Sequence, residues 1–204
     1  MKKHLVWALI PLALLLGGGI WGGVIQHTHN DANGGGSLIG NYAKLITQNT
    51  TLASINNSIA NTTLDTQTIP ANFIGSNRRI TYRAFLDIDQ ETGGAVNYPT
   101  FTCDFGGGFS YALTPSGSVP FATTIPVLFE CTVVSAGSAA NTKVMASVRV
   151  GNGATAGAST VDVLVGMIPG PNMTTDKTLS LKVANGSANV NYTTTFHYAV
   201  SEVS

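Results

Sequence analysis

The sequence predicts an all-β fold for residues 62–204: an antiparallel β-sandwich of immunoglobulin-like, pilin-like or jelly-roll topology. Three observations predict it. From residue 62 onward, apolar residues alternate with polar ones, which is the period of a half-buried strand. Turns rich in Gly, Pro and Asn separate these runs at intervals of about 8–15 residues, as in antiparallel sandwiches. The strand–helix–strand alternation of a parallel sheet is absent from the sequence.

An apolar helix or signal peptide is expected to precede the sandwich, in residues 1–25. Lys2 and Lys3 are followed by an uncharged apolar run whose second half is rich in glycine. This order of basic, apolar and small residues is that of a secretory signal. A run of about 20 residues is also long enough to cross a bilayer. We therefore expect export, with membrane contact only through this segment before cleavage, and a retained anchor as the alternative.

Residues 26–36 have no apolar side chain except one alanine, and they end in three glycines, so they are expected to form a flexible linker. His27, His29 and Asp31 lie in this linker. A metal site needs ligands held in fixed geometry, which a flexible segment does not provide. We therefore expect no metal there.

Residues 37–61 are expected to form a detachable tail, separate from the sandwich. Their apolar residues recur mostly at three- and four-residue spacing, which is helical. Their many Thr and Asn residues instead favour extended structure. A strand and a helix therefore both remain open. The apolar residues of this tail are Leu38, Ile39, Tyr42, Leu45, Ile46, Leu52, Ile55 and Ile59.

The clearest strand spans residues 80–90, where the even-numbered side chains are expected to face inward. Its acidic end, residues 87–91, suits either calcium or pairing with Arg78, Arg79 or Arg83. Residues 106–108, three glycines, predict a hairpin turn. The other expected strands are residues 101–105, 109–113, 125–133, 144–150, 161–167, 179–183 and 190–200. Their inward side chains include Tyr111, Tyr192, Tyr198 and Val200.

Cys103 and Cys131 both fall on inward positions of their strands. An even pair of cysteines in an exported chain predicts one disulfide, because disulfides persist in oxidising compartments. We expect this bond to join two strands inside the sandwich.

Charged residues make up only 10% of the chain and the net charge is zero, so the sequence lacks the basic field that nucleic acid binding requires. A surface with so few charges needs another source of hydration. Six Asn-x-Ser/Thr sequons predict that N-glycans supply it. These candidate glycosylation sites are Asn49, Asn56, Asn61, Asn172, Asn185 and Asn191.

The sequence offers no catalytic constellation. The four histidines, His4, His27, His29 and His197, are scattered over the signal, the linker and one outward strand position. A Gly-x-Ser-x-Gly nucleophile elbow is absent. The acidic residues give no recognisable pair for a sugar cleft. We therefore expect a protein that is not an enzyme and binds no cofactor.

The whole layout, an export signal, a Gly-rich linker, a tail and a glycosylated β-domain, resembles the archaeal thread pilins. A fainter similarity to the TasA/camelysin fibre proteins rests on residues 17–21, Asn30 and Asp31. The first resemblance implies an extracellular pilus for adhesion or biofilm. In it, copies of one chain join head to tail by donor-strand complementation, the tail of each completing the next sandwich.

Three other functions remain open. One is a type IV pilin, whose apolar N-terminal helix packs in the filament core. Another is a membrane-anchored viral capsid or spike protein with a jelly roll. The last is a carbohydrate-binding module, which requires exposed aromatic side chains. The expected inward direction of Tyr111, Tyr192 and Tyr198 counts against it.

Overall fold

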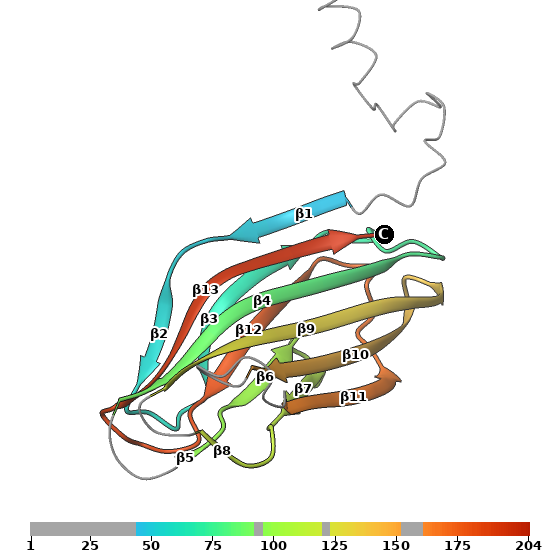
Figure 1. The fold of residues 1–204 in the computed structure, drawn as a ribbon. Helices are drawn as coiled ribbons and strands as arrows, with labels where there is room; N and C mark the ends of the chain where they lie inside the picture. The colour runs from blue at the N-terminus through green and yellow to red at the C-terminus, as the bar shows by residue number, and fades with distance from the viewer. Residues whose placement is uncertain (1–43, 92–95, 120–122, 152–160) are drawn as a thin grey trace, which may run out of the picture. The chain divides into compact units, whose positions relative to one another are not determined.

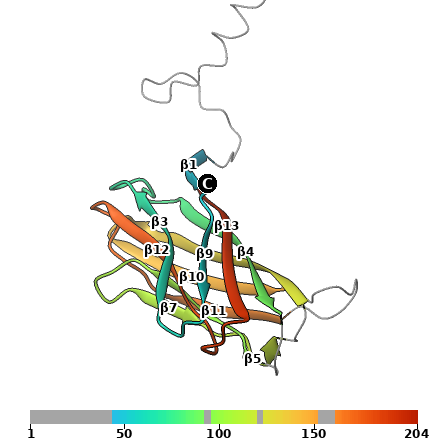
Figure 2. The ribbon, with the colours of Figure 1, turned by 90° about the vertical axis from the view of Figure 1, so that its left-hand side faces the viewer.

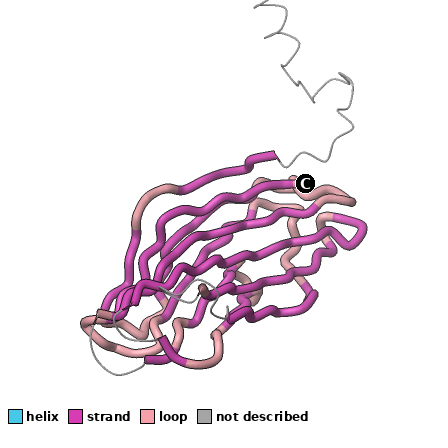
Figure 3. Tube along the Cα trace, viewed as in Figure 1, coloured by secondary structure: helices cyan, strands magenta, loops and turns pink. Residues whose placement is uncertain are grey.

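Two facing antiparallel sheets make up the sandwich (Figure 1). The computed structural model describes residues 44–91, 96–119, 123–151 and 161–204, and residues 42–204 belong to one unit. In the described ranges all regular secondary structure is β-strand, as the coloured trace in Figure 3 shows. The expected signal, the linker and the tail residues Leu38, Ile39 and Tyr42 lie outside the described residues.

The larger sheet has seven strands in the order β1-β13-β4-β9-β10-β11, and β2 also pairs with β13. All of its pairs are antiparallel. The strands are β1 (Lys44–Asn49), β2 (Ala53–Asn56), β4 (Arg79–Gln90), β9 (Thr123–Ser138), β10 (Asn141–Val150), β11 (Val161–Pro169) and β13 (Tyr192–Val203).

The smaller sheet has four strands in the order β3-β12-β6-β7 and covers one face of the larger sheet (Figure 2). These strands are β3 (Thr62–Ile69), β12 (Lys177–Ala184), β6 (Thr100–Asp104) and β7 (Ser110–Leu113). A two-stranded ribbon consists of β5 (Val96–Asn97) and β8 (Ser118–Val119). The predicted antiparallel sandwich is therefore confirmed, and its expected strands appear with small shifts at their ends.

The core lies between the sheets and follows the predicted alternation. The even-numbered apolar residues of β4, from Ile80 to Ile88, are all buried. The Phe129 ring of β9 stacks on Phe101 of β6 with their centroids 6.4 Å apart. It also meets Tyr82 edge-on at 6.2 Å. The contact between Phe101 and Phe129 joins the two sheets across the core, and the one between Tyr82 and Phe129 joins neighbouring strands of the larger sheet.

The predicted disulfide is present. Cys103 in β6 and Cys131 in β9 are bonded, with their Cα atoms 6.4 Å apart, and both are buried. Because β6 and β9 belong to different sheets, the bond is a covalent link across the core. A buried structural disulfide indicates an oxidising environment such as the cell exterior.

A β-bulge in β13 overturns part of the predicted alternation. The pairing of β13 with β4 shifts register between Phe196 and Tyr198. Before the shift Phe196 is buried, and after it Ala199 is buried, while Tyr198 and Val200 are only half-buried. The predicted inward direction of Tyr198 and Val200 is therefore wrong, because a bulge adds one residue and reverses the faces that follow.

The described part of the tail is extended rather than helical. Residues 44–49 and 53–56 form β1 and β2, consistent with the many Thr and Asn residues around them. Of the expected tail residues, Ile55 is buried with 4% exposed area and Ile46 is half-buried against the core. Leu45, Leu52 and Ile59 are exposed.

Candidate functional site: the N-terminal arm and its seam

Residues 44–56, called the arm here, lie along the outer edge of β13 (Figure 1). β1 pairs with residues 199–203 of β13, and β2 pairs with residues 193–196. The opposite edge of β13 pairs with β4 along its length. Among the described residues, the arm thus forms the edge of the larger sheet on this side.

Asn49 ends β1 and connects it to the core. Its Oδ1 accepts a hydrogen bond from the Thr51 backbone N–H at 2.9 Å, the local turn that Asn side chains form. Its Nδ2 donates to Oδ1 of Asp65 at 2.7 Å. One side chain therefore sets both where the first strand of the arm stops and what it contacts in the sandwich.

Asp65 is the centre of a buried polar cluster beneath the arm. It lies on β3, with only 3% of its area exposed. Its Oδ2 accepts hydrogen bonds from the Tyr82 hydroxyl at 2.8 Å and from Nε2 of Gln67 at 3.1 Å. Gln67 Oε1 in turn accepts from the Ser201 hydroxyl. Burying a carboxylate is costly unless such donors surround it.

The cluster keeps the hydroxyl group of Tyr82 protonated. Burial, together with the charge of Asp65 and its hydrogen bond, raises the pKa of Tyr82 far above its ordinary value. Tyr82 therefore remains a donor at any physiological pH. Tyr82 and Gln67 both reach Oδ2 of Asp65, whereas the contact to Oδ1 comes from the arm.

A second set of polar contacts fixes the other end of the arm. Nδ2 of Asn56 donates to the Val190 carbonyl at 2.9 Å and to the Thr193 hydroxyl at 2.7 Å. Asn185, which is buried, donates through Nδ2 to the Ile55 carbonyl at 3.3 Å. The arm is thus held by side-chain amides at both ends as well as by backbone pairing.

A short loop, residues 57–61, connects the arm to β3 in the other sheet. Its first residue, Asn57, has a positive φ of 50°. Asn tolerates this left-handed conformation better than most residues. The turn at Asn57 directs the chain from one sheet to the other, so its conformation decides whether the arm can lie on its own sandwich.

The predicted glycosylation sites differ in accessibility. Asn61 and Asn172 are exposed, as a glycan requires. Asn49 and Asn191 are half-buried, and Asn56 is exposed but bonded as described above. The expectation of six surface sites is wrong for Asn185, which is only 3% exposed. Its Nδ2 also donates to the Tyr192 carbonyl at 3.4 Å. A glycan on that nitrogen is incompatible with this fold.

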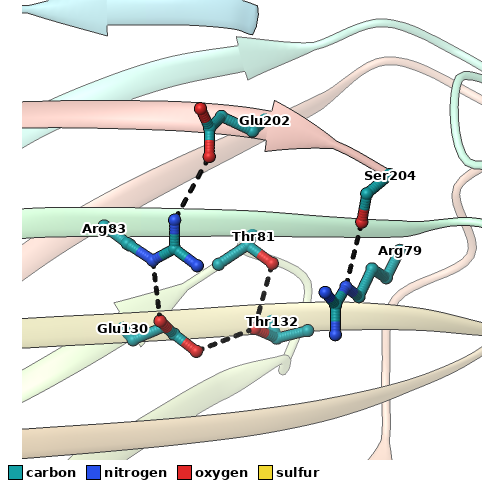
Figure 4. Close-up of polar contacts among 7 residues, drawn as sticks. All are labelled: Arg79, Thr81, Arg83, Glu130, Thr132, Glu202 and Ser204. Carbon is teal, nitrogen blue, oxygen red and sulfur yellow. Dashed lines mark hydrogen bonds and ion pairs between the residues drawn. The ribbon is translucent and has the colours of Figure 1, made fainter. Parts of the chain in front are cut away.

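Charged residues on the outer face of the larger sheet pair across strands (Figure 4). Nε of Arg83 contacts Glu130 of β9 at 2.9 Å, and Nη1 contacts Glu202 of β13 at 3.2 Å. Arg79 donates to the Ser204 hydroxyl at 2.9 Å, and Thr132 donates to Thr81. The pairs join three strands, but their side chains are 30–40% exposed, so each stabilises the fold only slightly.

The acidic segment, residues 87–91, was expected to pair with Arg78, Arg79 or Arg83, and the structure corrects this. Arg83 contacts the two glutamates. Asp87 instead bonds to Nε2 of His197 at 2.6 Å, and Asp89 accepts from Thr124. Within the described ranges, the structure contains no group of three or more His, Cys, Asp or Glu residues placed to hold a metal ion.

An aromatic pair lies on the same outer face. The rings of Phe85 and Tyr198 have centroids 6.0 Å apart, and Phe85 is 45% exposed. The bulge after Phe196 turns Tyr198 to this side. The objection to a carbohydrate-binding face assumed that Tyr111, Tyr192 and Tyr198 all point inward, and it therefore fails for Tyr198. Tyr192 is buried as predicted, and Tyr111 is half-buried with its hydroxyl donating to the Pro169 carbonyl at 2.6 Å.

Over the residues that the structure describes, no helix has the length and apolar character needed to cross a bilayer. The chain matches no protein-family model and no curated protein.

Similarity to solved structures is distant. The chain is similar to a structure of infectious bursal disease virus, Gt strain, with 12% identity and a TM-score of 0.31, over 79% of this chain and 32% of the viral one. It is similar to the CBM2 module of the evolved Dit protein of Lactobacillus casei BL23 phage J-1, with 11% identity, a TM-score of 0.30 and 67% of each chain. Trypanosoma rangeli sialidase follows, with 16% identity and a TM-score of 0.25, over 72% of this chain and 30% of the sialidase. All three TM-scores lie below 0.5, so none indicates a function.

Proposed function

We propose that this chain is a structural subunit of an extracellular, glycosylated filament, and that copies join by exchanging their N-terminal arms. One observation carries the proposal: among the described residues, the arm pairs with a single strand, β13, and its covalent connection to the sandwich is the short loop 57–61. An arm from a second copy can offer β13 the same contacts.

The physical basis is the edge that the arm covers. Without the arm, β13 has a row of unpaired N–H and C=O groups on its outer side, and such edges bind extended segments. When each copy gives its arm to the next, the contact is heterologous and does not close on itself. Repeated contacts of this kind give an open filament.

Exposed apolar side chains on and beside the arm support this role. Leu45, Leu52 and Ile59 are 50%, 67% and 64% exposed. They are three of the seven large apolar side chains that are exposed in the described part of the chain. Contacts with a neighbouring subunit would cover them. The disulfide and the exposed sequons Asn61 and Asn172 suit a protein of the cell exterior.

Cysteine cross-linking tests the exchange. Ser54 of the arm lies opposite Thr195 of β13, at a spacing that permits a disulfide. The sequence has only the two native cysteines, which are bonded to each other. In the variant S54C/T195C, mild oxidation of filaments should give a ladder of covalent oligomers on a non-reducing gel. The single variant S54C is the control.

Electron microscopy of the same material should show filaments, and these should be lost when residues 44–56 are deleted. Cross-links confined to single chains, together with particles that remain monomeric, would overturn the proposal. In that case the arm would serve only to complete its own sandwich.

Carbohydrate binding is the second candidate, favoured by the exposed Phe85 ring beside Tyr198. Flat aromatic faces bind sugar rings through their apolar surfaces. Affinity electrophoresis in polysaccharide gels tests it: Phe85→Ala should abolish any retardation, whereas Thr81→Ala, on the same outer face, should not. Equal migration with and without polysaccharide would exclude this role for the ligands used.

A further inference from the structure

Backbone pairing alone does not fix where the arm binds along β13. A strand that slides by two residues presents the same face to the core, because side chains alternate with a period of two. The arm is short and buries only one large apolar side chain deeply, Ile55. Its apolar contacts therefore discriminate weakly between registers. Something else must select the observed one.

The Asp65 cluster can provide this selection. The described hydrogen bonds to its Oδ2 come from the sandwich, and the one to Oδ1 comes from Asn49 of the arm. If the arm slides by two residues, Thr47 or Thr51 takes the place of Asn49. A threonine hydroxyl is closer to its own backbone than the Asn amide is, so it does not span the same distance to Oδ1. The carboxylate would then lose a hydrogen bond in a buried place.

We infer that Asn49 is the residue that sets the register of the arm and that Asp65 is its receptor, both in the closed chain and when the arm comes from a second copy. The second case rests on the proposed exchange. A hydrogen bond to a charged group is worth enough to favour the correct register by about tenfold or more. Asn56 on Thr193 supports the same register from the other end.

Exchange of the two polar groups tests this pair. N49D places a second carboxylate against Asp65, and the repulsion should expel the arm or shift it. The variant D65N should rescue N49D, because the amide introduced at position 65 can donate to the carboxylate introduced at position 49. The oxygen of that new amide can still accept from Tyr82 and Gln67. Rescue by the reciprocal change shows that the two positions are energetically coupled, as the contact between Asn49 and Asp65 predicts.

The register is measured by disulfide position. The pair S54C/T195C reports the observed register, and the pair S54C/T193C reports an arm that has slid so that Thr47 faces Asp65. Full-length protein made without N-glycans is used, since N49D also removes a sequon. We expect N49D to reduce the first cross-link about tenfold and to increase the second. N49D/D65N should restore the first to within about twofold of its original level.

The matched control is Gln48→Glu, which adds a charge at an exposed neighbouring position of the arm and should change neither cross-link. Cross-links that do not depend on residue 49, or that D65N does not restore, would overturn the inference. Mixing S54C chains with T195C chains then reports exchange between copies. If the single-chain results hold but mixed chains never cross-link, the register pair stands and the proposed filament assembly falls.

Discussion

The centre of the sandwich and its N-terminal arm are both β-structure, but different forces hold them. β4 pairs along its whole length with β13 on one side and β9 on the other, and its inward residues are almost fully buried. Within the part of the chain that the structure describes, the arm pairs only with β13, breaks at residues 50–52 and buries one large apolar side chain, Ile55. Polar contacts through Asn49 and Asn56 provide much of its specificity.

On the proposed function, this difference would separate the part that provides stability from the part that provides assembly. A strand in the middle of a sheet opens only when the domain unfolds, whereas an edge segment with few buried contacts can detach locally. The central strands can therefore remain folded while the arm leaves and binds elsewhere. The four predictions that follow test this division, from the largest expected effect to the smallest.

Truncating the central aromatic cluster should have the largest effect. Phe129→Ala removes a fully buried ring that contacts Phe101 and Tyr82, so it should lower the free energy of unfolding by about 4 kcal/mol. The control, Phe85→Ala, removes a ring that is 45% exposed and should cost about 1 kcal/mol or less. Denaturant titration measures both. Similar losses would mean that the stability does not reside in this core.

Removing the link between the sheets should have the next largest effect. The double variant C103A/C131A removes a bond between residues 28 apart in sequence, which should cost about 3.6 kcal/mol on the chain-entropy model. Thermal unfolding of the oxidised protein and the double variant measures this. The arm cross-link S54C/T195C should still form in the double variant below its melting temperature. Its loss would show that arm and core are not separate.

Within the arm, Ile55→Ala should favour detachment by about 2 kcal/mol, because it removes the one deeply buried large side chain. Amide hydrogen exchange in β2 should then be about thirtyfold faster, with little change in β4. Leu52→Ala, at a position that is 67% exposed, is the matched control and should leave both rates unchanged. Equal acceleration in β2 and β4 would contradict local opening.

The smallest effect is expected at the turn after the arm. Asn57 has φ at 50°, so Asn57→Ala should strain the closed turn by about 1 kcal/mol, whereas Asn57→Gly should not. Both variants keep the Asn56 sequon. If the turn acts as the hinge of the exchange, the Ala variant should give more cross-links between S54C and T195C chains than the Gly variant. The reverse order would show that the left-handed turn does not oppose opening.

The sequence was sufficient to predict the central strands, because the alternation of apolar and polar residues is a local pattern. The even-numbered residues from Ile80 to Ile88 are all apolar, and the same period of two, counted in their own strands, places Cys103 and Cys131 on inward faces. The bulge at His197 broke the pattern in β13, and only pairing with β4 reveals it. Alternation counted along one strand cannot detect an extra residue that depends on its partner.

The arm and its receptor were less predictable for a different reason. Its apolar spacing is compatible with a helix, and contacts with β13 decide in favour of strands. Asp65 and Gln67 occupy inward positions of β3, where alternation alone predicts apolar residues. Two polar residues at inward positions are a signal that a buried polar cluster leaves in a sequence. Its partners, Tyr82, Ser201 and Asn49, are 16 or more residues away, beyond the reach of local patterns.

The buried sequon at Asn185 also has a consequence for the biosynthesis of the protein. An oligosaccharide transferase can reach this amide only while the chain is still unfolded, because the closed domain excludes it. Because a glycan on Asn185 is incompatible with the closed domain, a chain modified there before folding could not reach this fold. Native material should therefore carry an unmodified Asn185, and a glycan found on it would contradict the buried position.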